Sequence, residues 1–189
     1  MPVTENLPGL ESFQQWATGD LVDNRTRGIF AEWLVGQALG CIKPGAHRQE
    51  WDAVDLNYCG VPVEVKASGR GPAWPQDKPS TIRFDISPTA NPWFAESNDW
   101  EELGAARRVA DIYVFCLHAS FPATSEEVAD VKTWQFWVVP TATLNQKFGA
   151  QKSVGMTRLD ELAERTSWAS LRSTVDRVIG EPPVPVPGS

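Results

Sequence analysis

Three charged residues could do chemistry together by their types and spacing: Asp55, Glu64 and Lys66. Carboxylate oxygens are the ligands that Mg²⁺ prefers in proteins. A lysine amine beside a bound cation is a better base than a free one, because the cation disfavours its charged form. Brought together in space, these side chains would form a metal site with a candidate base next to it.

The residues around them predict a β-hairpin. Apolar and polar side chains alternate over residues 54–58 and again over 61–66, which is the pattern of two half-buried strands. Cys59-Gly60 between these segments suits a two-residue turn. A turn of this length would pair Tyr58 with Val61.

Counting outward from that turn places Asp55 directly opposite Glu64, in a non-hydrogen-bonded pair where side chains approach most closely. Two facing carboxylates repel unless a cation lies between them, and Lys66 shares their face. Asp52 is a competing acid, but it would fall on the apolar side, opposite Ala67, which favours Asp55. An ordinary hairpin with charged residues on its solvent face remains an alternative.

A third carboxylate, Glu32, lies in a segment that predicts a helix over residues 27–39, with Asn24 or Thr26 as its cap and Gly40 as its end. Its neighbours three and four positions away are small or apolar: Gly28, Ile29, Val35 and Gly36. We therefore expect either that Glu32 points to the interior, where it needs a partner or a cation, or that it reaches out to solvent. The two glycines would let the helix approach the sheet closely.

Residues 67–80 are rich in glycine and proline and predict a loop that leaves the lysine end of the hairpin. Several of its side chains suit a sugar-phosphate backbone, with one aromatic ring able to stack on a base: Ser68, Arg70, Trp74, Gln76 and Lys78. A plain surface loop fits the same composition. The surrounding window 24–83 holds eight basic and six acidic residues, whereas the chain as a whole has a net charge of −7.

The rest of the chain predicts a single domain over residues 24–179, with an N-terminal arm (1–23) and a proline-rich tail (180–189) that we expect to be extended or disordered. The continuous apolar run 111–118 is typical of a central strand covered on both faces. Further strands are predicted at 81–87 and 133–140. Helices are predicted at 101–108, 141–148, 157–164 (opened by a capping box at Thr157-Arg158-Leu159-Asp160) and after Ser167.

Composition narrows the classes of protein. The acidic net charge argues against a general nucleic-acid binder. The three cysteines lack CxxC spacing, which argues against a structural zinc site and favours a reducing compartment. There is no signal-peptide pattern and no apolar run of membrane-spanning length, so we expect a cytoplasmic protein without a membrane partner. P-loop, dinucleotide-binding and Gly-x-Ser-x-Gly patterns are missing from the sequence, and we expect no small-molecule cofactor.

Taken in order, a helix with Glu32, then Asp55, then Glu64-Val65-Lys66, then further strands, resembles the PD-(D/E)xK nuclease superfamily over roughly residues 24–140. The segments around Glu32 and Lys66 look like those of uncharacterised bacterial proteins of this kind. One departure is Val54, which stands where the name of the superfamily has proline. The resemblance implies an α/β, restriction-endonuclease-like fold, with a three-layer core and a mixed central sheet flanked by helices.

The resemblance also implies a mechanism. Asp55, Glu64, the Val65 carbonyl and Glu32 would hold Mg²⁺, with Mn²⁺ as a substitute, and Lys66 would position and help deprotonate the attacking water. The implied activity is metal-dependent DNA endonuclease chemistry of restriction or defence type. DNA would be the partner, and a homodimer is expected because cutting both strands usually takes two sites. The alternative is a catalytically inactive module of this fold that binds DNA or a protein.

Overall fold

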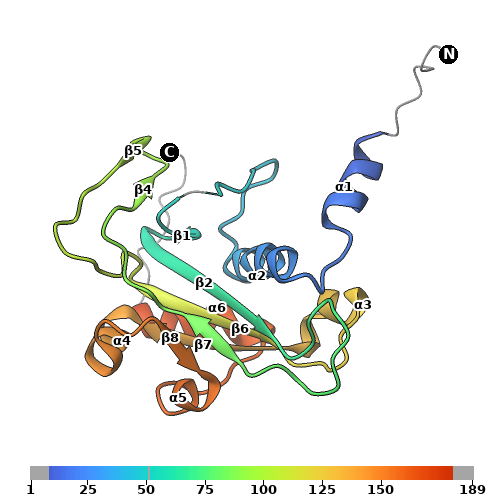
Figure 1. Ribbon diagram of the computed structural model, residues 1–189. Coiled ribbons are helices and arrows are strands. Elements are labelled where there is room, and N and C mark those ends of the chain that lie inside the picture. Colours follow the sequence, from blue (N-terminus) through green and yellow to red (C-terminus); the bar gives the residue numbers. More distant parts are fainter. Residues whose placement is uncertain (1–8, 51, 181–189) are drawn as a thin grey trace.

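The computed structural model describes residues 9–50 and 52–180, and a four-stranded sheet in the order β1-β2-β6-β7 lies at its centre (Figure 1). The strands are β1 (Leu56–Tyr58), β2 (Val61–Gly69), β6 (Ile112–His118) and β7 (Trp134–Pro140). β2 runs antiparallel to β1 and parallel to β6, while β7 runs antiparallel to β6. The protein is thus of the α/β class with a mixed sheet, as predicted.

The predicted hairpin is confirmed in its turn and its register. Cys59 and Gly60 form the turn with φ angles of 52° and 85°, and Tyr58 pairs with Val61. β1 is shorter than expected, since its first residue is Leu56, which pairs with Val63. Residues 52–55 before it bend away from the sheet, so within the described residues no strand pairs with this edge of β2 beyond Val63.

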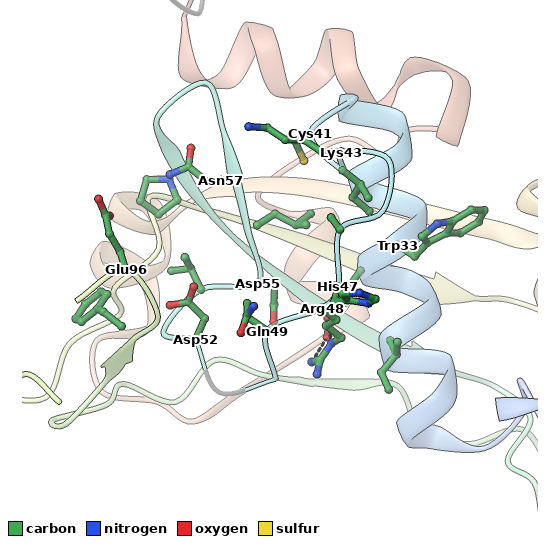
Figure 2. Close-up of a pocket in the computed structure, with 18 of the residues that line it drawn as sticks. Trp33, Cys41, Lys43, His47, Arg48, Gln49, Asp52, Asp55, Asn57 and Glu96 are labelled. Atoms are coloured by element: carbon green, nitrogen blue, oxygen red, sulfur yellow. Dashed lines mark hydrogen bonds and ion pairs between the residues drawn. The ribbon is translucent and has the colours of Figure 1, made fainter. Parts of the chain in front are cut away.

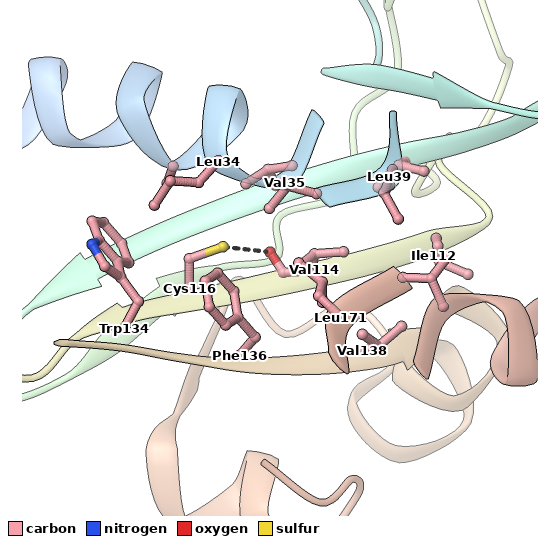
Figure 3. Packing of buried hydrophobic residues seen from close by; sticks show 14 of the residues in the cluster. Leu34, Val35, Leu39, Ile112, Val114, Cys116, Trp134, Phe136, Val138 and Leu171 are labelled. Carbon is pink, nitrogen blue, oxygen red and sulfur yellow. Dashed lines mark hydrogen bonds between the residues drawn. The ribbon is translucent and has the colours of Figure 1, made fainter. Parts of the chain in front are cut away.

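Helices α2 (Asn24–Leu39) and α6 (Trp168–Ile179) pack on one face of the sheet. Figure 3 shows the apolar layer between them, in which every second residue of β6 takes part: Ile112, Val114 and Cys116. α2 ends at Gly40 as predicted, with φ 71°. Its predicted start was wrong: Asp23 is the cap, and its carboxylate accepts hydrogen bonds from the backbone N–H groups of Arg25 and Thr26.

The opposite face is covered by a second apolar cluster. Here the alternate β6 residues Tyr113, Phe115 and Leu117 meet the small sheet of β3 (Arg83–Asp85) and β8 (Ser153–Gly155). Helices α4 (Thr141–Phe148) and α5 (Met156–Asp160) flank this small sheet, on the same side in Figure 1. All seven β6 residues are buried, which confirms the central strand, and α4 has the predicted bounds.

Two local predictions were wrong. Residues 101–108 form no helix. The segment is irregular and bends at Gly104 and Ala105, with one bridge between Thr89 and Arg107. It follows a two-stranded hairpin of β4 (Trp93–Phe94) and β5 (Asp99–Trp100). The capping box at residues 157–160 does not form, because α5 begins at Met156 after Gly155. Asp160 instead accepts hydrogen bonds from Trp137 and Arg165.

Two other elements differ in length or in their local contacts. The strand predicted at 81–87 covers only 83–85, although its predicted apolar face of Ile82, Phe84 and Ile86 is buried. Ser167 precedes α6 as predicted but makes no side-chain cap hydrogen bond.

The N-terminal segment carries α1 (Leu10–Thr18), in which no residue is buried, and Figure 1 shows this helix projecting from the rest of the chain. A short helix α3 (Ser125–Ala129) and a 3-10 turn (Val131–Thr133) precede β7. The predicted proline-rich tail lies outside the described residues apart from Gly180, as do residues 1–8 of the arm. Among the described residues, no helix has the length and apolar character needed to span a membrane.

Candidate functional site

Asp55 lies at the point where β1 leaves the edge of β2. Its Oδ2 accepts a hydrogen bond from the Val65 backbone N–H at 2.7 Å. In the hairpin register the next hydrogen-bonding partner of Val65 would be a backbone carbonyl at residue 54, but the chain has already bent away there. The carboxylate of Asp55 therefore takes the place of a strand carbonyl, close enough to Glu64 for the two charges to interact. The predicted strand pair of Asp55 with Glu64 does not form, because β1 begins at Leu56.

Glu64 and Lys66 lie on the same face of β2 and form an ion pair, with Lys66 Nζ 2.5 Å from Glu64 Oε1. Both are largely enclosed, with side-chain exposures of 15% for Glu64 and 29% for Lys66. The parallel pairing of β2 with β6 sets Tyr113 beside Glu64 and Phe115 beside Lys66. Two aromatic neighbours thus shield the ion pair from water.

Glu32 is held by a residue that the sequence did not single out. Both Glu32 oxygens accept hydrogen bonds from Arg48, from Nε and, at 2.8 Å, from Nη2. With 15% of its side chain exposed, Glu32 is partly buried, between the two predicted positions, and it is paired rather than alone. Arg48 also lies within the electrostatic influence of Asp55, so it links the helix carboxylate to the hairpin.

Asp55, Glu64 and Lys66 act on one another electrostatically, and the carboxylates outnumber the lysine. Burial, together with repulsion from Glu64 and Glu32, raises the pKa of Asp55 to about 7. Burial also raises the pKa of Glu64, against the pull of Lys66. For Lys66, burial alone would lower the pKa, but the attraction of Glu64 and Asp55 outweighs it and the net pKa is raised.

Tyr113 belongs to the same electrostatic cluster. Burial and the negative charge of Glu64 raise the pKa of its phenol to about 12. The phenol therefore stays protonated at neutral pH. A protonated hydroxyl beside a carboxylate is a potential hydrogen-bond donor to the site.

The donor chemistry of Asp55 and Glu64 suits a hard divalent cation. Mg²⁺ keeps several waters and needs only one or two carboxylates from a protein, and the excess negative charge here would favour it. In the part of the chain that the structure describes, however, no group of three or more His, Cys, Asp and Glu side chains is arranged to hold a metal. Glu32 and Glu64 are instead paired with Arg48 and Lys66.

A cleft of about 850 Å³ opens beside Asp55, between α2, the segment 41–49 and the start of β1 (Figure 2). Glu32, Arg48 and Asp55 line it, whereas Glu64 and Lys66 do not. Its other walls are mainly apolar and aromatic: Ile29, Trp33, Ile42, Leu56 and Phe94. The cleft therefore gives a ligand access to the Asp55 side of the cluster.

The residues predicted to bind DNA do not lie together in one loop in the structure. Ser68 is on β2 rather than in a loop, because β2 extends to Gly69. The Gln76 side chain closes the loop by donating to Ser80 Oγ at 3.0 Å and to the Arg70 carbonyl at 3.4 Å. Trp74, with 59% exposure, and Lys78 are at the surface and available to a partner.

Two neighbours of the site were missed from the sequence, Arg48 and Tyr113. Arg48 follows the turn at 43–46 and is sixteen residues from Glu32, so no helical or strand spacing connects the two. Tyr113 is part of the apolar run that was correctly read as a central strand, but its position beside Glu64 depends on which strand pairs with β2.

The chain matches no protein-family model, and no curated protein is similar to it.

Proposed function

We propose that this protein is a metal-dependent nuclease that hydrolyses phosphodiester bonds in DNA, with a fold of the restriction-endonuclease-like type. The observation that carries the proposal is the Asp55–Glu64–Lys66 cluster, in which the hydrogen bond from Val65 to Asp55 holds two enclosed carboxylates next to one lysine. The raised pKa of Asp55 reflects burial first and then repulsion from Glu64 and Glu32, and a bound cation would offset both effects.

Each residue has a role in this proposal. Asp55 and Glu64, helped by the Val65 carbonyl, would hold Mg²⁺ or Mn²⁺. The bound cation would neutralise charge developing on the phosphate and lower the pKa of a coordinated water. A cation held by Asp55 and Glu64 would disfavour the ammonium form of Lys66, which would lose its own proton to solvent. The neutral amine would then orient the attacking water and accept its proton. Glu32, held by Arg48, would support the site from α2.

The arrangement of the elements supports the same proposal. A short hairpin supplies Asp55 and Glu64-Val65-Lys66, a helix packed on the hairpin supplies Glu32, and the mixed sheet is covered on both faces. Water attacking in line, with departure of a sugar oxygen, is the reaction that this set of groups could carry. A link to restriction or defence, and action as a homodimer, are part of the same proposal.

The proposal is tested by incubating the protein with supercoiled, linear and branched DNA in Mg²⁺ or Mn²⁺. We expect cleavage that chelation abolishes and that Lys66→Ala reduces by at least about a hundredfold, the size of a typical general acid–base contribution. The control is Lys132→Ala, which removes an exposed lysine before β7 and should leave cleavage unchanged. Equal cleavage by Lys66→Ala and the parent protein would overturn the assignment.

A second candidate function is a non-catalytic module that binds DNA or a protein, as the ion pairs within the site suggest. Lys66 and Arg48 already neutralise Glu64 and Glu32 without a metal. Calorimetry separates the two functions. A nuclease should bind Mn²⁺ in a manner that Glu64→Ala abolishes and that Glu102→Ala, an exposed control, preserves. A non-catalytic module should show no such binding.

A further inference from the structure

A second hollow, of about 430 Å³, lies on the β3–β8 side of the sheet, away from the cleft beside Asp55. Three arginines line it, one from each of three different segments: Arg70 after β2, Arg83 on β3 and Arg158 on α5. Hydroxyl side chains make up much of the remaining wall: Ser80, Thr81, Ser153 and Thr157.

Secondary structure holds the three arginines around one space. Arg83 faces Gly155 across the β3–β8 pair, and its Nη1 lies 3.4 Å from Ser153 Oγ. Arg70 Nη2 contacts the Met156 sulfur at 3.8 Å, at the start of α5. The Arg70 carbonyl accepts from the Ser80 N–H at 2.8 Å, which draws the two ends of the loop together. These contacts bring the arginines together although they are far apart in the sequence.

The positive charge of this hollow is largely uncompensated. No carboxylate is among its lining residues. Arg158 pairs with Glu161 at 3.4 Å, but both side chains are more than half exposed, so the pair is weak. Within the described residues, neither Arg70 nor Arg83 forms an ion pair with a carboxylate. An acidic protein with a net charge of −7 thus keeps an arginine-lined, acid-free concavity.

Guanidinium groups and hydroxyls together are the donors that proteins use for phosphate oxygens. The polar face of β2 runs from Glu64 through Lys66 and Ser68 toward Arg70. At about 3.3 Å per residue, Arg70 lies about 13 Å along the strand from Lys66. Since a B-DNA strand rises about 3.4 Å per nucleotide, this is a separation of a few nucleotides.

We propose that the hollow lined by Arg70, Arg83 and Arg158 is a phosphate-binding subsite that holds a backbone phosphodiester of a nucleic acid a few nucleotides from the Asp55–Glu64–Lys66 cluster. The choice of a nucleic acid rests on the proposed nuclease function. The preference for a phosphate group rests only on the lining of the hollow.

The test measures binding without cleavage. A fluorescent 20-base-pair duplex is titrated with the full chain in EDTA at several salt concentrations, and anisotropy gives the dissociation constant. Arg70→Gln, Arg83→Gln, Arg158→Gln and the triple variant are compared with Arg177→Gln, which removes an exposed arginine of α6. All five variants remove the same type of side chain, and thermal unfolding checks that each one is folded.

We expect each single variant in the hollow to weaken binding severalfold and the triple variant by at least about a hundredfold. The slope of log K against log [salt] should fall by about 0.9 for each arginine that contacts a phosphate. Arg177→Gln should match the parent protein. Unchanged affinity and slope in the triple variant would overturn the proposal.

Inorganic phosphate serves as a second probe, measured by calorimetry. We expect it to bind far more weakly than the duplex and to compete only at high concentration. If free phosphate binds as tightly as the duplex, the assignment to a nucleic acid is overturned, and if a phosphoserine peptide outcompetes the duplex, the ligand is a protein instead.

Cleavage assays separate this proposal from the proposed function. If the protein binds DNA through the three arginines but cleaves no DNA, the proposed subsite is supported and the proposed nuclease function is overturned. If the triple variant cleaves DNA as fast as the parent protein and with the same KM, the nuclease function is supported and the proposed subsite is overturned.

Discussion

At the scale of single residues, the carboxylate of Asp55 has two roles with opposite effects on stability. It substitutes for a strand carbonyl at the edge of β2, where the Val65 N–H needs an acceptor. Its negative charge, however, is enclosed and lies near Glu64 and Glu32, so its pKa rises to about 7. The hydrogen bond favours the folded protein, and ionisation opposes it.

A pH dependence follows from this pKa. The unfolded chain loses the Asp55 proton near pH 3.8, whereas the folded protein keeps it until about pH 7. Between these values the folded state binds more protons, so the free energy of unfolding of the metal-free protein should fall as pH rises.

Asp55→Asn should remove this pH-dependent loss of stability, because an amide does not ionise. Its amide oxygen can still accept a hydrogen bond from the Val65 N–H. At pH 8 we expect the variant to be more stable than the parent by about 2 kcal/mol, because one pKa unit is worth about 1.4 kcal/mol and Glu64 shares the titration. Urea unfolding in EDTA at pH 4 and pH 8 measures the effect. Asp99→Asn, at an exposed position, should show no such gain, and a less stable Asp55→Asn at pH 8 would contradict the assignment.

At the scale of elements, the turn of the β1–β2 hairpin sets the register of Leu56–Tyr58 on β2, and Asp55 directly precedes this paired segment. Gly60 has φ 85°, and a methyl group added there would touch no other atom. Gly60→Ala should therefore destabilise the protein only through backbone strain, by about 1–2 kcal/mol.

Gly28 on α2 is a matched control, because it also has open space around it but a helical backbone. Gly28→Ala should stabilise the protein by about 0.5–1 kcal/mol. Chemical denaturation of both variants measures these opposite signs. Equal effects would mean that the turn geometry does not govern the hairpin.

The two glycines of α2 do not serve the same purpose, although both were predicted to allow close packing on the sheet. At Gly36 an added methyl group would clash with the Ile42 side chain, so this glycine does allow a close approach, mainly to the segment after the helix. Gly28 allows none. The spacing of glycines along a helix identifies a shared side but not what packs against it.

At the scale of the whole molecule, two apolar layers hold the sheet, and the helix α6 from the end of the chain completes one of them. Leu171 of α6 is fully buried in the same cluster as Leu34 and Val35 of α2. The site residue Glu32 is on α2, so the packing of α6 supports the site from a distance.

Leu171→Ala should cost about 2–5 kcal/mol, the range for truncating a buried leucine. Leu10→Ala makes the same change on α1, where the side chain is 69% exposed, and should alter stability by less than about 0.5 kcal/mol. Thermal or urea unfolding compares the two. Similar losses for both would show that α1 packs on a surface in solution.

Local patterns determined much of this protein. The alternation over residues 54–66 with Cys59-Gly60 predicted the hairpin and its register, and the apolar run predicted β6. The end of α2 at Gly40 also followed from residue type. These features depend on neighbours a few positions apart, which is the range over which side-chain periodicity and turn preferences act.

Only the tertiary structure decided the surroundings of the candidate site. The parallel pairing of β2 with β6 set Tyr113 beside Glu64, and the path of the segment after α2 brought Arg48 to Glu32. The hollow of Arg70, Arg83 and Arg158 joins three distant segments in the same way. Apolar burial and strand pairing hold these groups together, and a local pattern shows that a strand must pair without naming its partner.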